Sequence, residues 1–160
     1  MALDDPDTAR IVAFLESIGI PVRIEPVQPD SFLPGIAIHS GGLAVDPSRP
    51  FYPGDLLHEA GHIAVTDPAL RATGTVSEDP GDEMAAIAWS YAAVRAIGLN
   101  SRIVFHDHGY RGGGPSLAEA FDSGSYPGAP MLQYYGMSAE PHQAERLMLA
   151  PYPQMSRWLR

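Results

Sequence analysis

Apolar residues at helical spacing, bounded by capping and breaking residues, predict three helices in the first hundred positions. The first follows Asp5-Pro6 and stops at Gly19, and its apolar stripe consists of Ile11, Phe14, Leu15 and Ile18. An aspartate cap, a proline in the first turn and a terminal glycine are typical of helix boundaries. Pro53-Gly54-Asp55 opens a second predicted helix, from Leu56 to about Val65. Asp79-Pro80 opens a third, which runs to about Ile97 and is apolar nearly all round, as is typical of a central buried helix.

Alternating and short apolar runs predict a small sheet before the second helix. Within residues 20–27, Val22 and Ile24 alternate with charged neighbours, and the flanking prolines favour a strand at a sheet edge. Two runs, 35–39 and 43–46, flank Ser40-Gly41-Gly42 and predict a β-hairpin. A further short strand is expected at Arg102–His106. These elements together predict an α+β fold with a small antiparallel sheet packed on helices.

Composition narrows the possible functions. The chain has 160 residues, 19 of them acidic and 10 basic, which gives a formal net charge of −9. So acidic a chain is a poor partner for nucleic acid or anionic membranes, which require clustered positive charge. The absence of cysteine excludes disulfide scaffolds, thiolate metal sites and cysteine nucleophiles. We expect a single cytoplasmic domain over 1–160, with a core at 1–98 and a C-terminal extension at 101–160 to which the sequence assigns no role.

The strongest chemical signal is the motif His-Glu-x-x-His at residues 58–62 on the second predicted helix. Residues four apart on an α-helix differ by about 40° in direction and about 6 Å along the axis, so His58 and His62 can converge on one ion. Zn²⁺ binds imidazole nitrogen at about 2.0–2.1 Å. Glu59 lies on the neighbouring side, where it can act as a general base toward a zinc-activated water. The residues that flank the motif are uncharged, so a surface helix that carries these two histidines and the glutamate by chance is a poor explanation.

A catalytic zinc usually has three protein ligands and one open position. The metzincin pattern is excluded, because Val65 and Pro68 occupy the positions where it needs glycine and histidine. Glu83, near the start of the third helix, shares the face of Ile87 and Tyr91 and is the favoured third ligand. Asp82 and Glu78 are the alternatives.

This pattern resembles the gluzincin metallopeptidases, in which a glutamate on the following helix completes the site. It is most similar to the small ImmA/IrrE-like metallopeptidases, which combine a helix, antiparallel strands, a motif helix with glycine before its second histidine, and a glutamate-bearing helix. The resemblance covers about residues 1–98 and implies a zincin-like fold, with His58, His62 and Glu83 as zinc ligands and Glu59 as catalytic base. Residues 101–160 resemble no such pattern, so cleavage of a repressor partner is not implied.

Several weaker candidates complete the expectations. His106 and His108, followed by Tyr110 and Arg111, form a loop that could stabilise the oxyanion of a hydrolysed carbonyl. His39 ends a predicted strand and is more simply a turn residue, and Tyr134 and Tyr135 are expected in the core.

The leading hypothesis is a zinc-dependent metallopeptidase acting on a peptide or protein. The alternative is a non-catalytic zinc module that docks a protein partner. A fourth protein ligand would favour the docking module, and His39, His106 and His108 are the candidates for it.

Overall fold

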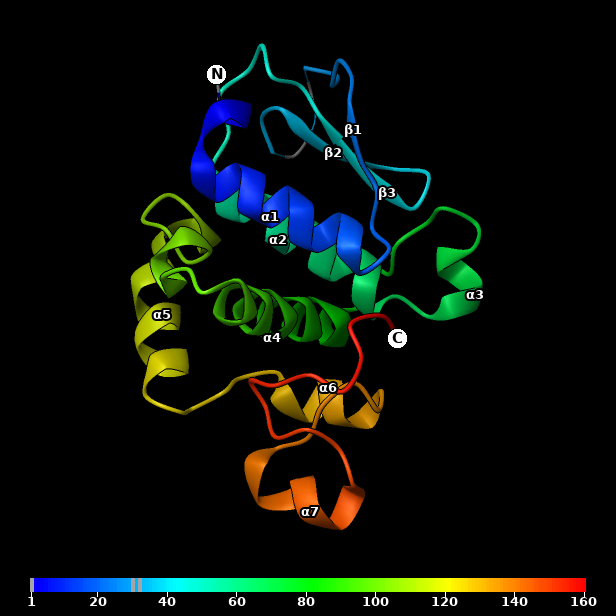
Figure 1. The fold of residues 1–160 in the computed structure, drawn as a ribbon, viewed down its shortest axis with the longest axis vertical. Coiled ribbons are helices and arrows are strands. Elements are labelled where there is room, and N and C mark those ends of the chain that lie inside the picture. The colour runs from blue at the N-terminus through cyan, green and yellow to red at the C-terminus, as the bar shows by residue number, and fades with distance from the viewer. Residues whose placement is uncertain (1, 30, 32) are drawn as a thin grey trace.

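Two helices, Pro53–Val65 (α2) and Pro80–Ile97 (α4), pack against each other at the centre of the protein (Figure 1). The computed structural model describes residues 2–29, 31 and 33–160. Within that part of the chain the fold is α+β, with seven α-helices and one sheet of three strands. The other helices are α1 (Pro6–Ser17), α3 (Pro68–Arg71), α5 (Gly114–Asp122), α6 (Ala129–Tyr134) and α7 (Ala144–Leu147). The three helices predicted in the first hundred residues correspond to α1, α2 and α4.

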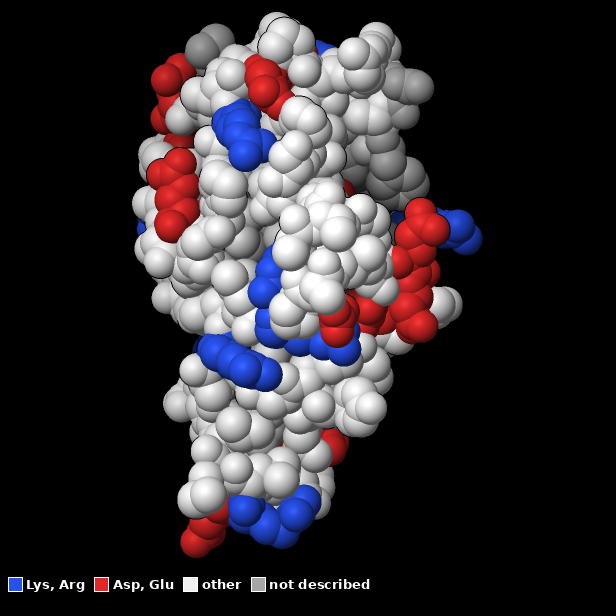
Figure 2. All heavy atoms as spheres, turned by 90° about the vertical axis from the view of Figure 1, so that its right-hand side faces the viewer, with Lys and Arg blue, Asp and Glu red and all other residues white. Residues whose placement is uncertain are grey.

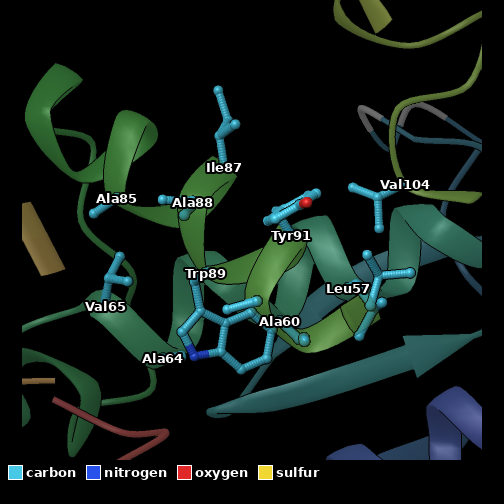
Figure 3. Close-up of a cluster of buried hydrophobic side chains, with 14 of the residues drawn as sticks. Leu57, Ala60, Ala64, Val65, Ala85, Ile87, Ala88, Trp89, Tyr91 and Val104 are labelled. Atoms are coloured by element: carbon cyan, nitrogen blue, oxygen red, sulfur yellow. The ribbon is translucent and has the colours of Figure 1, made fainter. Parts of the chain in front are cut away.

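The α4 helix is buried because it lies between other elements. Figure 1 shows α1, α2 and the sheet on one side of it and α6 on the other. Its middle turns consist largely of alanine, and Trp89 is directed toward the face of α2 that bears Ala60 and Ala64 (Figure 3). Gly98 ends the helix with a φ of 81°, a left-handed conformation that glycine adopts readily. No helix in the described residues is both long enough and apolar enough to cross a membrane.

Small residues allow α2 and α4 to approach closely. A Cβ atom added at Gly61 would lie 2.8 Å from the backbone oxygen of Ala86. Near the other end of α2, a Cβ at Gly54 would lie 1.8 Å from the oxygen of Ile103. Both distances are shorter than van der Waals contact, so each glycine marks a place where two backbones touch.

The sheet is mixed rather than antiparallel, which corrects the expectation from sequence. Strands β2 (Ile36–His39) and β3 (Gly42–Val45) form the predicted hairpin around Ser40 and Gly41. Strand β1 (Val22–Ile24) lies on the other side of β3 and runs parallel to it. A parallel pairing needs a long connection, and residues 25–41, which include β2, form it. In the strand order β1-β3-β2, β1 is an edge strand, in keeping with its flanking prolines.

The strand expected at Arg102–His106 is also wrong. Residues Ser101–Ile103 form a 3₁₀ turn instead. The Asn100 side chain accepts a hydrogen bond from the Arg102 backbone N–H at 2.9 Å, and the Phe105 backbone N–H donates to the Ser101 oxygen. These local bonds satisfy the backbone in a turn, so the segment needs no partner strand.

Arginine groups satisfy the last carbonyl groups of α2. The backbone N–H of Arg160 donates to the Ala64 oxygen at 2.9 Å, and its guanidinium donates to Val65 at 3.2 Å. Arg71 donates to the Thr66 oxygen and to that of Arg160. Helix ends leave such carbonyls without intrahelical partners, and cations there also suit the helix dipole.

On the face shown in Figure 2, basic side chains form a band across the middle, with acidic ones beside it.

The contact between α2 and α4 can be tested at Gly61. We expect Gly61→Ala to lower the free energy of unfolding by about 1–3 kcal/mol, because the added methyl group overpacks the backbone of Ala86. Urea denaturation with a two-state fit measures this change. A variant as stable as the wild type would contradict the close approach of the two helices.

Candidate metal-binding site

His58 and His62 of α2 converge with Glu83 of α4. The Nε2 atoms of the two histidines lie 3.2 Å apart. Carboxylate oxygens of Glu83 lie 3.0 Å from Nε2 of His62 and 3.7 Å from Nε2 of His58. Among the described residues, these three form the one group of histidine, aspartate or glutamate side chains close enough together to hold a metal ion.

Local helix geometry explains this convergence. His58 and His62 are separated by one turn of α2, so both rings leave the same side of that helix. Glu83 is in the first turn of α4, where Asp79 caps the helix by accepting from the Gly81 N–H at 2.7 Å. The close packing of α2 and α4 then brings the carboxylate to the two rings.

The two alternative ligands lie elsewhere. Asp82 is buried, and its carboxylate accepts a hydrogen bond from the Tyr135 hydroxyl. Glu78 is exposed in the loop before α4, where it borders the same cleft without joining the cluster. The structure thus groups Glu83 with the two histidines and leaves Asp82 and Glu78 apart.

Burial and neighbouring charges shift the pKa values of the two histidines in opposite directions. Burial lowers the pKa of His58 to about 4, and the neighbouring His62 contributes in the same direction. Burial would also lower the pKa of His62, but its hydrogen bond and attraction to Glu83 raise it above the ordinary value. The same hydrogen bond lowers the pKa of Glu83. His58 is therefore neutral at pH 7, with His62 and Glu83 paired beside it.

Glu59 lies beside this cluster without belonging to it. Its Oε1 is 4.0 Å from Nε2 of His58, and only 15% of its side chain is exposed. Burial raises its pKa, and the carboxylates of Asp55 and Glu83 add to the shift. A raised pKa makes this carboxylate a stronger base than a solvated glutamate.

A cleft of about 920 Å³ opens over the cluster. One side consists of the segment before β2 and the strand itself, including Leu33, Pro34 and Ile38. Another side is the loop from His106 to Arg111, and the turn before α4 forms a third. His58, Glu59, His62 and Glu83 all line this cleft, so a molecule bound in it can reach them.

In the loop from His106 to Arg111, the two histidine rings have different contacts. Nε2 of His106 lies 2.8 Å from a carboxylate oxygen of Asp55, and Nδ1 accepts from the backbone N–H of His108 at 3.3 Å. A neutral His106 therefore donates from Nε2 to Asp55 and has no N–H left for a substrate. Tyr52 stacks on His106 with the ring centroids 4.1 Å apart. His108 is exposed in the cleft, and its ring stacks on Tyr52 at 5.6 Å.

Asp55 and Tyr110 are site residues whose contacts sequence reasoning missed. Asp55 precedes Glu59 by one helical turn, a spacing that could have placed it on the same face. Tyr110 places its hydroxyl 3.0 Å from Nδ1 of His58. Burial raises the pKa of Tyr110, and a side-chain hydrogen bond with Ser90 offsets part of that shift. No local pattern indicates this contact, because it depends on the path of the loop.

The backbone of the loop is strained at Tyr110 and Arg111. Tyr110 and Arg111 have φ angles of 56° and 55°, in the left-handed region that non-glycine residues seldom adopt. Such a conformation costs about 1–3 kcal/mol per residue and is held by surrounding contacts. The bond from Tyr110 to His58 is one of those contacts.

The remaining candidates lie away from the cluster. His39 is exposed and its Nδ1 lies 3.1 Å from Glu25, consistent with a turn residue. The expectation that Tyr134 is in the core is wrong, because it is 81% exposed. Tyr135 packs against the core, bonds to Asp82, and lies under the guanidinium of Arg160.

Comparison of the chain with protein-family models, with curated proteins and with solved structures finds no match in any of the three. The function proposed below therefore rests on the geometry and chemistry of the site.

The roles of Glu83 and Asp82 can be separated by two alanine variants. We expect Glu83→Ala to weaken zinc binding by more than about 100-fold, since even loss of an outer partner of a ligand costs 10–100-fold. We expect Asp82→Ala to keep the affinity but lose about 1–3 kcal/mol of stability, because Tyr135 loses its buried acceptor. Chelator competition and urea denaturation measure the two quantities. The reverse pattern would mean that Asp82 is the ligand.

Proposed function

We propose that the protein is a zinc-dependent peptidase with a zincin-like arrangement of its motif helix and glutamate helix. The observation that carries the proposal is the convergence of His58, His62 and Glu83 at the floor of a cleft, with Glu59 beside them. Two imidazoles and one carboxylate form the ligand set of several catalytic zinc sites.

The three side chains fit a zinc ion in chemistry and in spacing. Tetrahedral zinc with bonds of about 2.0–2.2 Å has its ligand atoms about 3.3 Å apart. Here the two Nε2 atoms are 3.2 Å apart, Oε2 of Glu83 lies 3.0 Å from Nε2 of His62, and its other oxygen, Oε1, lies 3.7 Å from Nε2 of His58. The low pKa of His58 keeps its nitrogen deprotonated, as metal binding requires.

When bound, zinc would supply a Lewis acid that acidifies a water molecule and polarises a carbonyl group. Glu59 is positioned to take the proton from that water, because its carboxylate is buried at the edge of the cluster. The same carboxylate can pass the proton to the amine that leaves as the peptide C–N bond breaks. His108 and Arg111 border the cleft and are the available donors to the carbonyl oxygen, since His106 is engaged by Asp55.

Strand β2 supports a peptide as the substrate. It is an edge strand, and its residue Ile38 borders the cleft. The Asp46 N–H donates to the Gly35 oxygen, so in the alternating antiparallel pattern Ala37 also faces β3 and Ile38 does not. The N–H and C=O of Ile38 thus point away from the sheet, where an extended peptide could pair with them.

The non-catalytic docking module has less support. A structural zinc site usually has four protein ligands, but only three side chains cluster in the part of the chain that the structure describes. His39 bonds to Glu25 and His106 to Asp55, so two of the three candidate fourth ligands are engaged elsewhere. Glu59 would also have no role in a purely structural site.

The catalytic role of Glu59 is tested by Glu59→Gln. Glutamine matches glutamate in size, so we expect zinc content of about one ion per chain to persist in both proteins. Glutamine cannot accept the proton, and activity should fall by about 10²–10⁴-fold. Hydrolysis of a mixed peptide library, followed by mass spectrometry on protein of matched zinc content, measures the change.

His62→Ala serves as the companion variant, and it should lose both zinc and activity. Equal peptide cleavage by wild type and Glu59→Gln would contradict the role of Glu59. Wild-type protein that binds zinc through a fourth protein ligand and cleaves no peptide would favour the docking module instead.

A further inference from the structure

The cleft over the metal-binding cluster carries opposite charges in two separate parts of its wall. The segment before α4 contributes the carboxylates of Glu78 and Asp79 to one part, and the loop 106–111 contributes the Arg111 guanidinium to another. The side chains of Glu78 and Arg111 are exposed, and neither has a hydrogen-bond or ion-pair partner among the described residues. Both charges are therefore free to meet a molecule bound in the cleft.

Helix α2 places these two parts of the wall at opposite ends of the cleft. In the first turn of α2, an oxygen of Asp55 lies 2.8 Å from Nε2 of His106, which begins the loop. After its last turn, Oγ1 of Thr66 accepts from the backbone N–H of Ser77, next to Glu78, at 3.1 Å. Asp55 and Thr66 are about 16 Å apart along the axis, at a rise of about 1.5 Å per residue. An extended peptide of about five residues covers that length.

The groups between the two ends add little net charge. Glu59 and Glu83 contribute two carboxylates, which a divalent ion bound to the cluster would offset. Asp55 is bonded to its histidine partner, and only 13% of its side chain is exposed. The two ends therefore differ mainly through the exposed charges of Glu78 and Arg111.

Strand β2 runs along the cleft in the same direction as α2. A Cβ added at Gly35, just before the strand, would lie 3.4 Å from Cβ of Arg49, shortly before α2. A Cβ added at Gly41, in the turn after the strand, would lie 3.9 Å from the oxygen of Arg71, whose guanidinium donates to Thr66 after the end of α2. Figure 1 shows this turn on the side of α3. The strand thus leads from the end near the loop 106–111 toward the acidic end.

This direction fixes how a peptide lies when it pairs with the open edge of β2. Antiparallel pairing is slightly more stable per residue than parallel pairing, so we take the peptide to run opposite to β2. Its N-terminal part then lies at the end of Glu78, and its C-terminal part lies at the end of Arg111.

We propose that the cleft selects peptides with a basic residue on the N-terminal side of the cleaved bond and an acidic residue on the C-terminal side, with Glu78 and Arg111 as the specificity-determining residues. The inference rests on the proposed function, because it names the substrate class of the same site. Complementary charges of this kind set which partner is chosen more than how tightly it is held.

Cleavage of a library of defined peptides by the zinc-loaded protein tests this selection, with cleavage sites read by mass spectrometry. We expect lysine or arginine to be enriched before the cleaved bond and aspartate or glutamate after it. Glu78→Gln should reduce the preference for basic over neutral residues in kcat/KM by about 2–5-fold, and Arg111→Gln should do the same for acidic over neutral residues. Each preference is a ratio, so any contribution of Arg111 that all substrates share cancels. High salt should also weaken both preferences, because it screens exposed charges.

Two further kinds of variant make the cleavage test specific. Glu78→Lys should turn the preference before the cleaved bond from basic toward acidic residues. Glu145→Gln and Arg146→Gln are matched controls, because both residues are exposed on α7 and do not line the cleft. Both controls should keep the wild-type preferences.

A binding measurement separates this inference from the proposed function. The probes are the peptide Lys-Lys-Ala-Ala-Ala-Ala-Glu-Glu and its reversed sequence, both acetylated and amidated to remove the terminal charges. Calorimetric titration of zinc-loaded Glu59→Gln protein at low salt should show at least about 2-fold tighter binding of the first peptide. Equal affinities, or acidic residues enriched before the bond that wild type cleaves, would overturn the selection. The expected difference in affinity without any cleavage by wild type would overturn the peptidase and leave the selection standing.

Discussion

The close approach of α2 and α4 is the constraint on which the rest of the structure depends. It is possible because Gly61 has no side chain where the backbone of Ala86 passes, and because α4 presents mostly alanine to its neighbours. At this separation a carboxylate from the first turn of α4 reaches two imidazoles on α2. A wider spacing would leave Glu83 as an ordinary solvated residue at a helix N-terminus.

The helices could be predicted because their signals are local. Aspartate before proline, apolar residues every three or four positions and a final glycine all act within one helix. The helices α1 and α4 show all three signals, whereas α2 shows only the apolar spacing and the proline, with Tyr52 as its N-cap and Thr66 as its C-cap. The parallel pairing of β1 could not be predicted, because it depends on where a strand of three residues meets β3. The strand expected at Arg102–His106 is wrong for a local reason, because this apolar-rich segment begins in a turn that the Asn100 side chain caps.

The residues of the candidate site also fall into those that local spacing predicts and those whose contacts depend on the path of a loop. His58, Glu59 and His62 follow from spacing on one helix, and Glu83 was favoured over Asp82 because it shares the face of Ile87. The structure brings the side chains of these four residues close together. The contacts of Tyr110 and His106 depend instead on a glycine-rich loop whose path includes two consecutive left-handed residues. Side-chain spacing contains no information about such a path, so the loop was a candidate by composition and its bonding was not predictable.

Residues 101–160, which include this loop, help to hold α2 in place. The sequence assigned them no role, yet they contact α2 at both ends: Ile103 meets Gly54 near the first turn, and Arg160 satisfies carbonyl groups of the last. Between these ends, Tyr110 binds His58, and Phe105 and Phe121 join the same hydrophobic core as α4. A histidine held on one side by its own helix and on the other by a distant loop cannot rotate freely. The C-terminal region therefore helps to set the orientation of His58, which a helix alone leaves to side-chain rotation.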